Sequence, residues 1–233
     1  MLLEVIAATV EDAVEAEQGG AGRIELVREL GRGGLTPPVA LIEAVVQAVK
    51  IPVRVMLRDS EPFELSDRAE LNHLAAAART AQQDGAAGFV MGFLRDGVPD
   101  LPAVRQVLGV LDVRATFHHA FDRADRPLDA LAALGAEPRI DRVLTTGGTG
   151  HWRRRLARLQ QYRLAAPAHV RILPGGGLDA RALRSLAING YAEAHVGRAA
   201  RVPAEPHGRV QAARVARLIA AAEGRDDLEN LHV

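Results

Sequence analysis

Five charged or imidazole side chains interrupt runs of sequence that otherwise have the composition of buried β-strands. They are Glu4, Glu25, Arg58, His118 and His195. Buried strands are filled mainly by branched apolar residues, so a charge inside one must be paired or take part in chemistry. Carboxylates and imidazoles exchange protons or bind metal ions, and a guanidinium holds anions. These residue types predict either acid–base chemistry on a small anion or a metal site.

The densest polar segment is ATFHHAFD at residues 115–122, which ends one predicted strand and enters the next loop. Side chains alternate between the two faces of a strand, so Thr116 and His118 share one face while Phe117 and His119 share the other. We therefore expect His118, rather than His119, to point into the site. Asp122 is a further candidate for acid–base chemistry or for orienting its neighbours.

Structural explanations remain open for the same residues. Glu4 and Glu25 would also be explained if they only neutralised Arg58 in an ion pair. His195 is equally consistent with a hydrogen-bonded imidazole of the core.

Two glycine-containing loops follow the last two predicted strands, in the sequences LPGGG and VGR. Backbone N–H groups at such turns and at helix starts favour anions, and barrels often bind phosphate there. Turn geometry alone would also account for the glycines. The predicted anion-binding residues are Gly175, Gly176, Gly177, Gly197 and Arg198.

Short β-type runs alternate with amphipathic helical runs along the whole chain, which predicts parallel strands joined by helices. Eight such pairs in 233 residues fit a single (β/α)8 TIM barrel. An open doubly wound sheet is less consistent, because no GxGxxG turn follows the first strand. The predicted strands are Leu2–Ala8, Arg23–Val27, Val53–Arg58, Gly88–Leu94, Arg114–His119, Arg142–Thr145, Val170–Pro174 and Glu193–Gly197.

No linker or change in composition divides the chain, so we expect one domain over residues 1–223 and a C-terminal tail over 224–233. The formal net charge is zero and the basic residues are scattered, which argues against a nucleic-acid partner. No apolar run is long enough for a membrane span, and no export signal is visible. The chain has no cysteine, which excludes disulfides, thiolate metal sites and a cysteine nucleophile.

The ordered landmarks of the sequence resemble the CutC family of copper homeostasis proteins from Leu3 to about Arg201. They are LEV with Glu4, GAGRIEL with Glu25, GGLTP at residues 33–37, VRVMLR ending at Arg58, TFHHAFD, RVLTTGG, LPGGG and the strand of His195. The usual family motif TFHRAFD has arginine where this chain has His119, so a role of that arginine is not carried over. The resemblance implies a cytoplasmic (β/α)8 barrel that is homo-oligomeric and linked to copper.

Copper chemistry limits what that resemblance can mean here. Copper(I) prefers thiolate and thioether ligands, and this chain has no thiolate. Imidazole and carboxylate ligands could still hold copper(II) or zinc. A weak copper site at the barrel mouth would use His118, His195 and Glu25.

Two alternatives to copper handling stay open. In the first, the chain is an enzyme acting on a small anionic or phosphorylated metabolite, with Arg58 and the glycine loops holding the anion. His118 and Glu25 would then exchange protons with the substrate, and Glu4, Asp122 and His195 would tune them. In the second, the barrel is an oligomeric scaffold whose polar residues serve stability alone.

Overall fold

Eight parallel strands form the central sheet of the protein, as the alternating sequence pattern predicts. The structure is a computed structural model and describes residues 1–225. The strands are β1 (Leu2–Ala7), β2 (Arg23–Leu26), β3 (Val53–Met56), β4 (Gly88–Met91), β7 (Arg114–Phe117), β8 (Ile140–Thr145), β9 (Arg171–Pro174) and β10 (Glu193–Val196).

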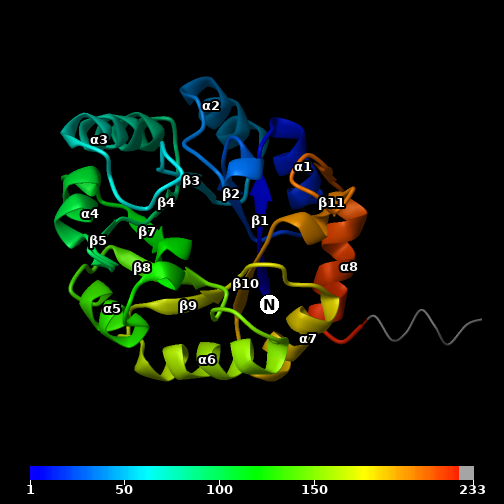
Figure 1. Ribbon diagram of the computed structural model, residues 1–233. Coiled ribbons are helices and arrows are strands. Elements are labelled where there is room, and N and C mark those ends of the chain that lie inside the picture. Colours follow the sequence, from blue (N-terminus) through cyan, green and yellow to red (C-terminus); the bar gives the residue numbers. More distant parts are fainter. Residues whose placement is uncertain (226–233) are drawn as a thin grey trace, which may run out of the picture.

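The sheet curls into a (β/α)8 barrel (Figure 1). Its strand order is β10-β1-β2-β3-β4-β7-β8-β9, and every hydrogen-bonded pair is parallel. The ring closes where β9 and β10 lie in contact, although these two strands share no backbone ladder. The predicted fold class is confirmed.

Helices follow the strands and form the outer ring (Figure 1). Side-chain caps start several of them: Thr9, Asp67, Asp100 and Asp179 each accept a hydrogen bond from a backbone N–H of the first turn. The helices are α1 (Val10–Gln18), α2 (Val39–Ala48), α3 (Arg68–Gln83), α4 (Leu101–Leu108), α5 (Pro127–Leu134), α6 (Trp152–Ala165), α7 (Ala180–Ile188) and α8 (Ala212–Ala222). Of the predicted tail, only residues 224 and 225 are among those described.

Two short hairpins interrupt this regular alternation and were not predicted. One consists of β5 (Leu94–Arg95) and β6 (Val98–Pro99), and the other of β11 (Arg201–Val202) and β12 (Arg209–Val210). The first hairpin takes Leu94 out of the predicted strand 88–94, so β4 ends at Met91.

Two further strands, β3 and β7, end two residues earlier than predicted. Arg58 lies beyond β3, where its backbone N–H donates to Thr36 Oγ1 instead of continuing the sheet. His118 follows β7 and caps the 3₁₀ turn His119–Arg123, since its Nδ1 accepts a hydrogen bond from the Ala120 N–H.

The amino-terminal half of the barrel interior is ionic rather than apolar. Several ion pairs join strands that are not neighbours and therefore run across the interior. Arg23 of β2 donates to Glu193 of β10 at 2.8 Å, and Arg142 of β8 donates to the same carboxylate at 2.7 and 2.9 Å. Arg54 of β3 donates to both oxygens of Asp141 on β8, at 2.8 and 2.7 Å.

Replacement of Arg54 by leucine should lower the free energy of unfolding by about 3 kcal/mol, because the partly buried charge of Asp141 then keeps only Arg142 as a partner. Urea unfolding measures the change. The double variant R54L/D141L should recover much of the loss. As a control, Arg126→Leu removes the exposed pair with Asp129 and should cost less than about 1 kcal/mol. Equal losses in the two single variants would contradict a special role of the interior pairs.

Candidate functional site

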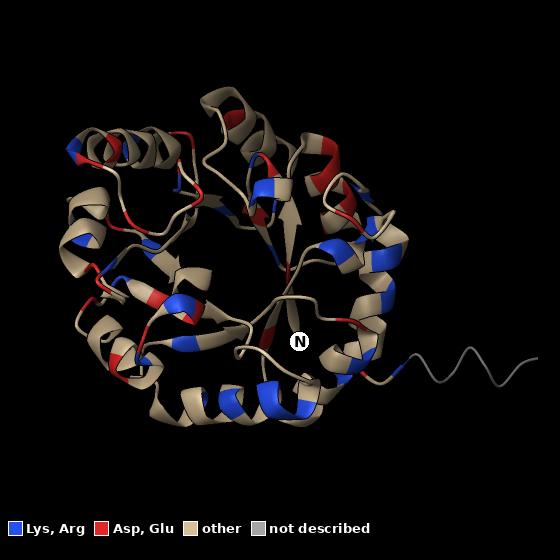
Figure 2. Cartoon of the chain, viewed as in Figure 1, with Lys and Arg blue, Asp and Glu red and all other residues tan. Residues whose placement is uncertain are grey.

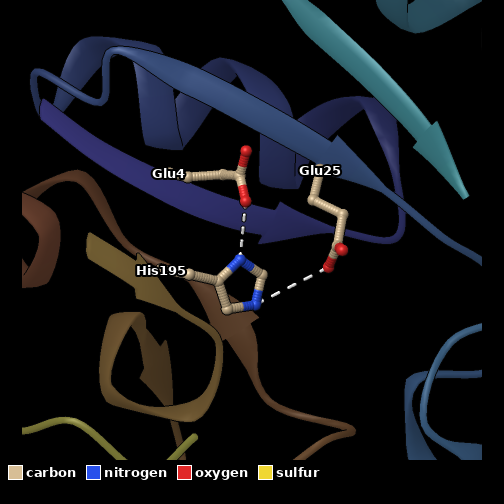
Figure 3. Close-up of side chains that lie close together, drawn as sticks. All are labelled: Glu4, Glu25 and His195. Carbon is tan, nitrogen blue, oxygen red and sulfur yellow. Dashed lines mark hydrogen bonds and ion pairs between the residues drawn. The ribbon is translucent and has the colours of Figure 1, made fainter. Parts of the chain in front are cut away.

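Glu4, Glu25 and His195 lie together inside the barrel, on the adjacent strands β1, β2 and β10 (Figure 3). The strand register places Glu4 directly beside His195, and Glu25 follows on the next strand. The Nδ1 atom of His195 lies 2.8 Å from Glu4 Oε1, and its Nε2 atom lies 3.7 Å from Glu25 Oε2. The three residues are 0, 3 and 4 % exposed, respectively. This is a buried carboxylate–imidazole–carboxylate arrangement.

Glu4 is held as a carboxylate by two cationic neighbours. Arg23 donates a hydrogen bond to Oε2, and the Nδ1 atom of His195 lies against Oε1. Burial alone would raise the pKa of Glu4, but the hydrogen bond from His195 and the charge of Arg23 hold it far below its ordinary value. Both carboxylate oxygens are therefore already used, which suits Glu4 for orienting His195.

Glu25 has the opposite electrostatic character. Burial raises its pKa to about 7, against the opposing charge of His195. Its Oε1 atom is buried and has no hydrogen-bond partner among the described residues. Burial alone would lower the pKa of His195, but the charge of Glu25 and the bond to Glu4 raise it. Glu25 can thus hold or release a proton near neutral pH, and His195 keeps its proton more readily than a free imidazole.

An apolar layer packs on the carboxyl side of this cluster. Val27, Met56 and Val90 form it, each within one residue of the carboxyl end of β2, β3 or β4, and Ile6 of β1 packs against them. The cluster therefore lies in the barrel interior below the mouth. The five interrupting residues therefore divide into two groups: Glu4, Glu25 and His195 lie together in the interior, whereas Arg58 and His118 lie in the loops after β3 and β7.

His118 does not join the predicted metal-binding set with His195 and Glu25. Among the described residues, the group of three or more His, Asp or Glu side chains that could share an ion is Glu4, Glu25 and His195. Because the Ala120 N–H can only donate, His118 Nδ1 must accept and the proton sits on Nε2. Burial, and then the charge of Arg58, holds the pKa of His118 well below its ordinary value. His118 is a neutral imidazole, packed 5.1 Å from the Phe63 ring.

Arg58 does not pair with Glu4 or Glu25, so that structural explanation is also wrong. Its guanidinium donates to the backbone carbonyls of Ser60 at 2.9 Å and Glu61 at 2.5 Å. It also lies 4.9 Å from the centre of the Phe63 ring. These contacts hold the loop after β3 around Arg58.

Asp122 also serves its own loop. It accepts hydrogen bonds from the Thr145 hydroxyl and the Thr146 N–H, and it contacts His119 at 3.0 Å. These contacts tie the 3₁₀ turn after β7 to the end of β8.

One of the predicted glycine loops touches the buried cluster. A Cβ atom on Gly175 would lie 2.6 Å from Leu144 and 3.3 Å from the His195 ring, so only glycine fits without a shift. Arg155 of α6 donates to the carbonyls of Gly175 and Gly176, at 3.0 and 2.7 Å. Gly177 has open space around it, Gly197 lies against Ile6, and Arg198 begins a 3₁₀ turn.

Sequence reasoning missed Arg23 and Arg155. Arg23 begins its strand, where a charge looks ordinary, and Arg155 lies among five arginines on α6. The useful signal for Arg23 was the number of acids on three adjacent strands. Glu4 lies on β1, Glu25 on β2 and Glu193 on β10. That excess of buried negative charge requires a buried cation.

The model of the CutC family matches residues 1–200. The chain belongs to the CutC family. It is 38% identical over 198 residues to the copper homeostasis protein cutC homolog of Homo sapiens, a match that covers 83% of this chain and 72% of the human protein. The homolog of Mus musculus matches to the same extent. The family match includes Glu4, Glu25 and His195.

Solved structures agree with the fold. The crystal structure of a CutC protein from Streptococcus agalactiae has a TM-score of 0.74 at 24% identity, covering 84% of this chain and 98% of that one. Orotidine 5'-phosphate decarboxylase from Pyrococcus horikoshii has a TM-score of 0.64 at 15% identity, covering 96% and 100%. Both likenesses concern the barrel alone. None of the described helices of this CutC family member is long and apolar enough to cross a membrane.

The metal-free stability of the Glu25→Gln variant should change with pH differently from that of the wild type. The Glu25 pKa rises from 4.5 to about 7 on folding, so the neutral carboxyl stabilises the fold at low pH, and this contribution is lost as the pH rises towards 7. Glutamine cannot ionise. The stability of E25Q relative to wild type should therefore increase from about pH 5 to pH 8, by at most about 3 kcal/mol.

Urea unfolding across that pH range measures the difference. Glu43→Gln, at an exposed position of α2, is the matched control and should follow the wild-type pH profile. Parallel curves for E25Q and wild type would contradict the raised pKa of Glu25.

Proposed function

We propose that the protein takes part in copper homeostasis by binding copper(II) weakly inside the barrel, between His195 and Glu25. One observation carries this proposal. The His195 Nε2 and Glu25 Oε2 atoms face each other across 3.7 Å, which is too long for a hydrogen bond, and Glu25 Oε1 has no partner among the described residues. The imidazole of His195 and the carboxylate of Glu25 thus point at the same space, and Glu25 Oε1 is a further oxygen that could coordinate an ion.

Glu4 completes this arrangement from the far side of the imidazole. It accepts the hydrogen bond of His195 Nδ1, which leaves Nε2 as the coordinating atom once its proton is lost. Carboxylates that orient a ligating histidine in this way raise its basicity and fix its ring. Imidazole and carboxylate donors suit copper(II) or zinc, and the absence of cysteine argues against a copper(I) site.

The proposed site differs from the predicted one in its third residue and in its depth. The predicted ligand His118 is absent from it, Glu4 joins it as the residue that orients His195, and the site lies beneath Val27, Met56 and Val90 instead of at the mouth. Entry of an ion therefore requires side chains of that layer to move. A location in the cytoplasm and a homo-oligomeric state remain predictions from the family resemblance.

Copper(II) titration of the metal-free protein, followed by calorimetry and by visible absorption, tests the proposal. His195→Ala and Glu25→Gln should abolish stoichiometric binding because each removes a ligand. Glu4→Gln should weaken it by about 10- to 100-fold, as expected for a residue that orients a ligand. The affinity should rise with pH, since His195 must lose its proton.

His118→Ala is the matched control, because it removes a buried imidazole that lies outside the cluster. It should retain copper(II) binding. Two outcomes would overturn the proposal. In one, His118→Ala and His195→Ala lose copper(II) affinity equally; in the other, the wild type binds copper(II) no more strongly than His195→Ala does.

Acid–base catalysis on a small anionic metabolite is the second candidate function. It is favoured by Glu25, whose buried carboxyl titrates near pH 7 beside a charged imidazole, as a general acid or base requires. In that case Glu25 would exchange the proton, and His195, held by Glu4, would stabilise the charge that develops.

A thermal-shift screen of copper(II) and phosphorylated metabolites on wild type and Glu25→Gln, followed by a turnover assay of each metabolite that stabilises the protein, separates the two candidates. Stabilisation by an organic anion, with turnover lost in E25Q, would favour catalysis. Stabilisation by copper(II) alone would favour the copper proposal.

A further inference from the structure

A cavity lies at the amino-terminal face of the barrel, in the seam between β9 and β10. It has a volume of about 200 Å³. It is lined by Arg163, Val170, Arg171, Ile172, Gly190, Tyr191, Ala192 and Glu193. Most of these residues begin β9 and β10 or directly precede them, so the cavity opens at the amino-terminal ends of the strands. It exists where the ring closes without a backbone ladder.

Tyr191 lines this cavity and carries an unpaired polar group. The residue is buried, and its hydroxyl has no hydrogen-bond partner among the described residues. A buried hydroxyl without a partner is unfavourable, because it loses its water and gains nothing in return. Burial also raises the pKa of Tyr191 to about 12, so the hydroxyl keeps its proton and can donate.

The cavity wall carries excess positive charge. Arg171 is 68 % exposed, and only its Nη1 donates to Glu193, at 2.9 Å. Glu193 is neutralised by Arg23 and Arg142 as well, so its carboxylate does not cancel Arg171. Arg163 lies over the Tyr191 ring at 4.6 Å and adds a second cation.

The surroundings reinforce this charge. The cavity borders the carboxyl end of α6, where Arg163 lies, and α6 carries no acidic residue, so it shows blue stretches and no red in Figure 2. By contrast, α1 on another side of the ring carries Glu11, Asp12, Glu15 and Glu17. A negatively charged ligand is therefore favoured at the seam.

We propose that this cavity binds a small organic carboxylate that carries a short apolar or aromatic group. The carboxylate would bind the guanidinium of Arg171 and the hydroxyl of Tyr191, and the apolar group would pack on Val170, Ile172 and the Tyr191 ring. Burial of the ligand satisfies the unpaired hydroxyl and uses the free N–H groups of Arg171. The proposal is independent of the copper site, which lies among other residues deeper in the barrel.

Benzoate is the probe, and isothermal titration calorimetry with the full-length protein is the measurement. Benzyl alcohol and benzylamine test the charge, because they keep the ring and replace the carboxylate with a neutral or a cationic group. Benzoate should bind with a stoichiometry of one, and the other two should bind at least about tenfold more weakly.

Variants locate the binding. Arg171→Gln should weaken benzoate binding about tenfold through loss of a charge-assisted hydrogen bond, and Tyr191→Phe should weaken it severalfold. Arg114→Gln is the matched control, because Arg114 is an exposed arginine at the start of β7 on the same face of the barrel. The R114Q variant should bind benzoate as tightly as the wild type does. Without ligand, Tyr191→Phe should be at least as stable as wild type, because it removes an unpaired hydroxyl.

Several outcomes would overturn the proposal. They are failure of benzoate to bind wild type, equal binding of benzyl alcohol, and equal weakening by R114Q and R171Q. Unchanged benzoate affinity in both R171Q and Y191F would place the ligand elsewhere and would overturn it as well.

Discussion

The buried carboxylate of Glu4 is the constraint on which the rest of the barrel interior depends. An unpaired carboxylate in such a place would cost several kcal/mol, so the fold must supply cations on both sides of it. Arg23 lies opposite Glu4 on β2, and His195 lies opposite it on β10. Both partners reach Glu4 only when β1 lies between β2 and β10, and Glu4 and His195 are 191 residues apart in sequence. The charge balance of Glu4 therefore requires the first and last strands of the barrel to lie side by side.

The same balance extends across the amino-terminal half of the barrel. Arg23 also binds Glu193, which in turn binds Arg142 and Arg171. These side-chain contacts tie β8, β9 and β10 together at the seam where β9 and β10 form no ladder. Ion pairs between side chains thus join strands that backbone hydrogen bonds would join elsewhere in the sheet. The cavity beside Tyr191 lies at this seam.

The fold and the three central site residues could be predicted from the sequence for simple reasons. Alternating strand and helix patterns determine a parallel barrel, and charges inside apolar strands stand out as Glu4, Glu25 and His195 do. Their partners could not be predicted in the same way. The sequence suggested Arg58 as the cation that neutralises Glu4. Strand register decides the ion pair instead, because it places Arg23 of β2 directly beside Glu4. The tautomer of His118 depends on a single N–H group, that of Ala120, which no pattern in the sequence reveals.

Charge balance also bears on how copper(II) could enter a site that already holds two cations, Arg23 and His195. Burial of a divalent ion beside them would be costly unless positive charge left at the same time. With Glu25 and His195 both protonated, loss of their two protons would remove two positive charges from the cluster, which equals the charge of the ion. Glu4 and Arg23 would keep their charges and their pairing throughout, because the pKa of Glu4 is far too low for it to take up a proton. Under the proposed function, the site therefore exchanges protons for copper(II) at nearly constant buried charge, and this explains why a carboxyl that titrates near neutral pH faces the imidazole.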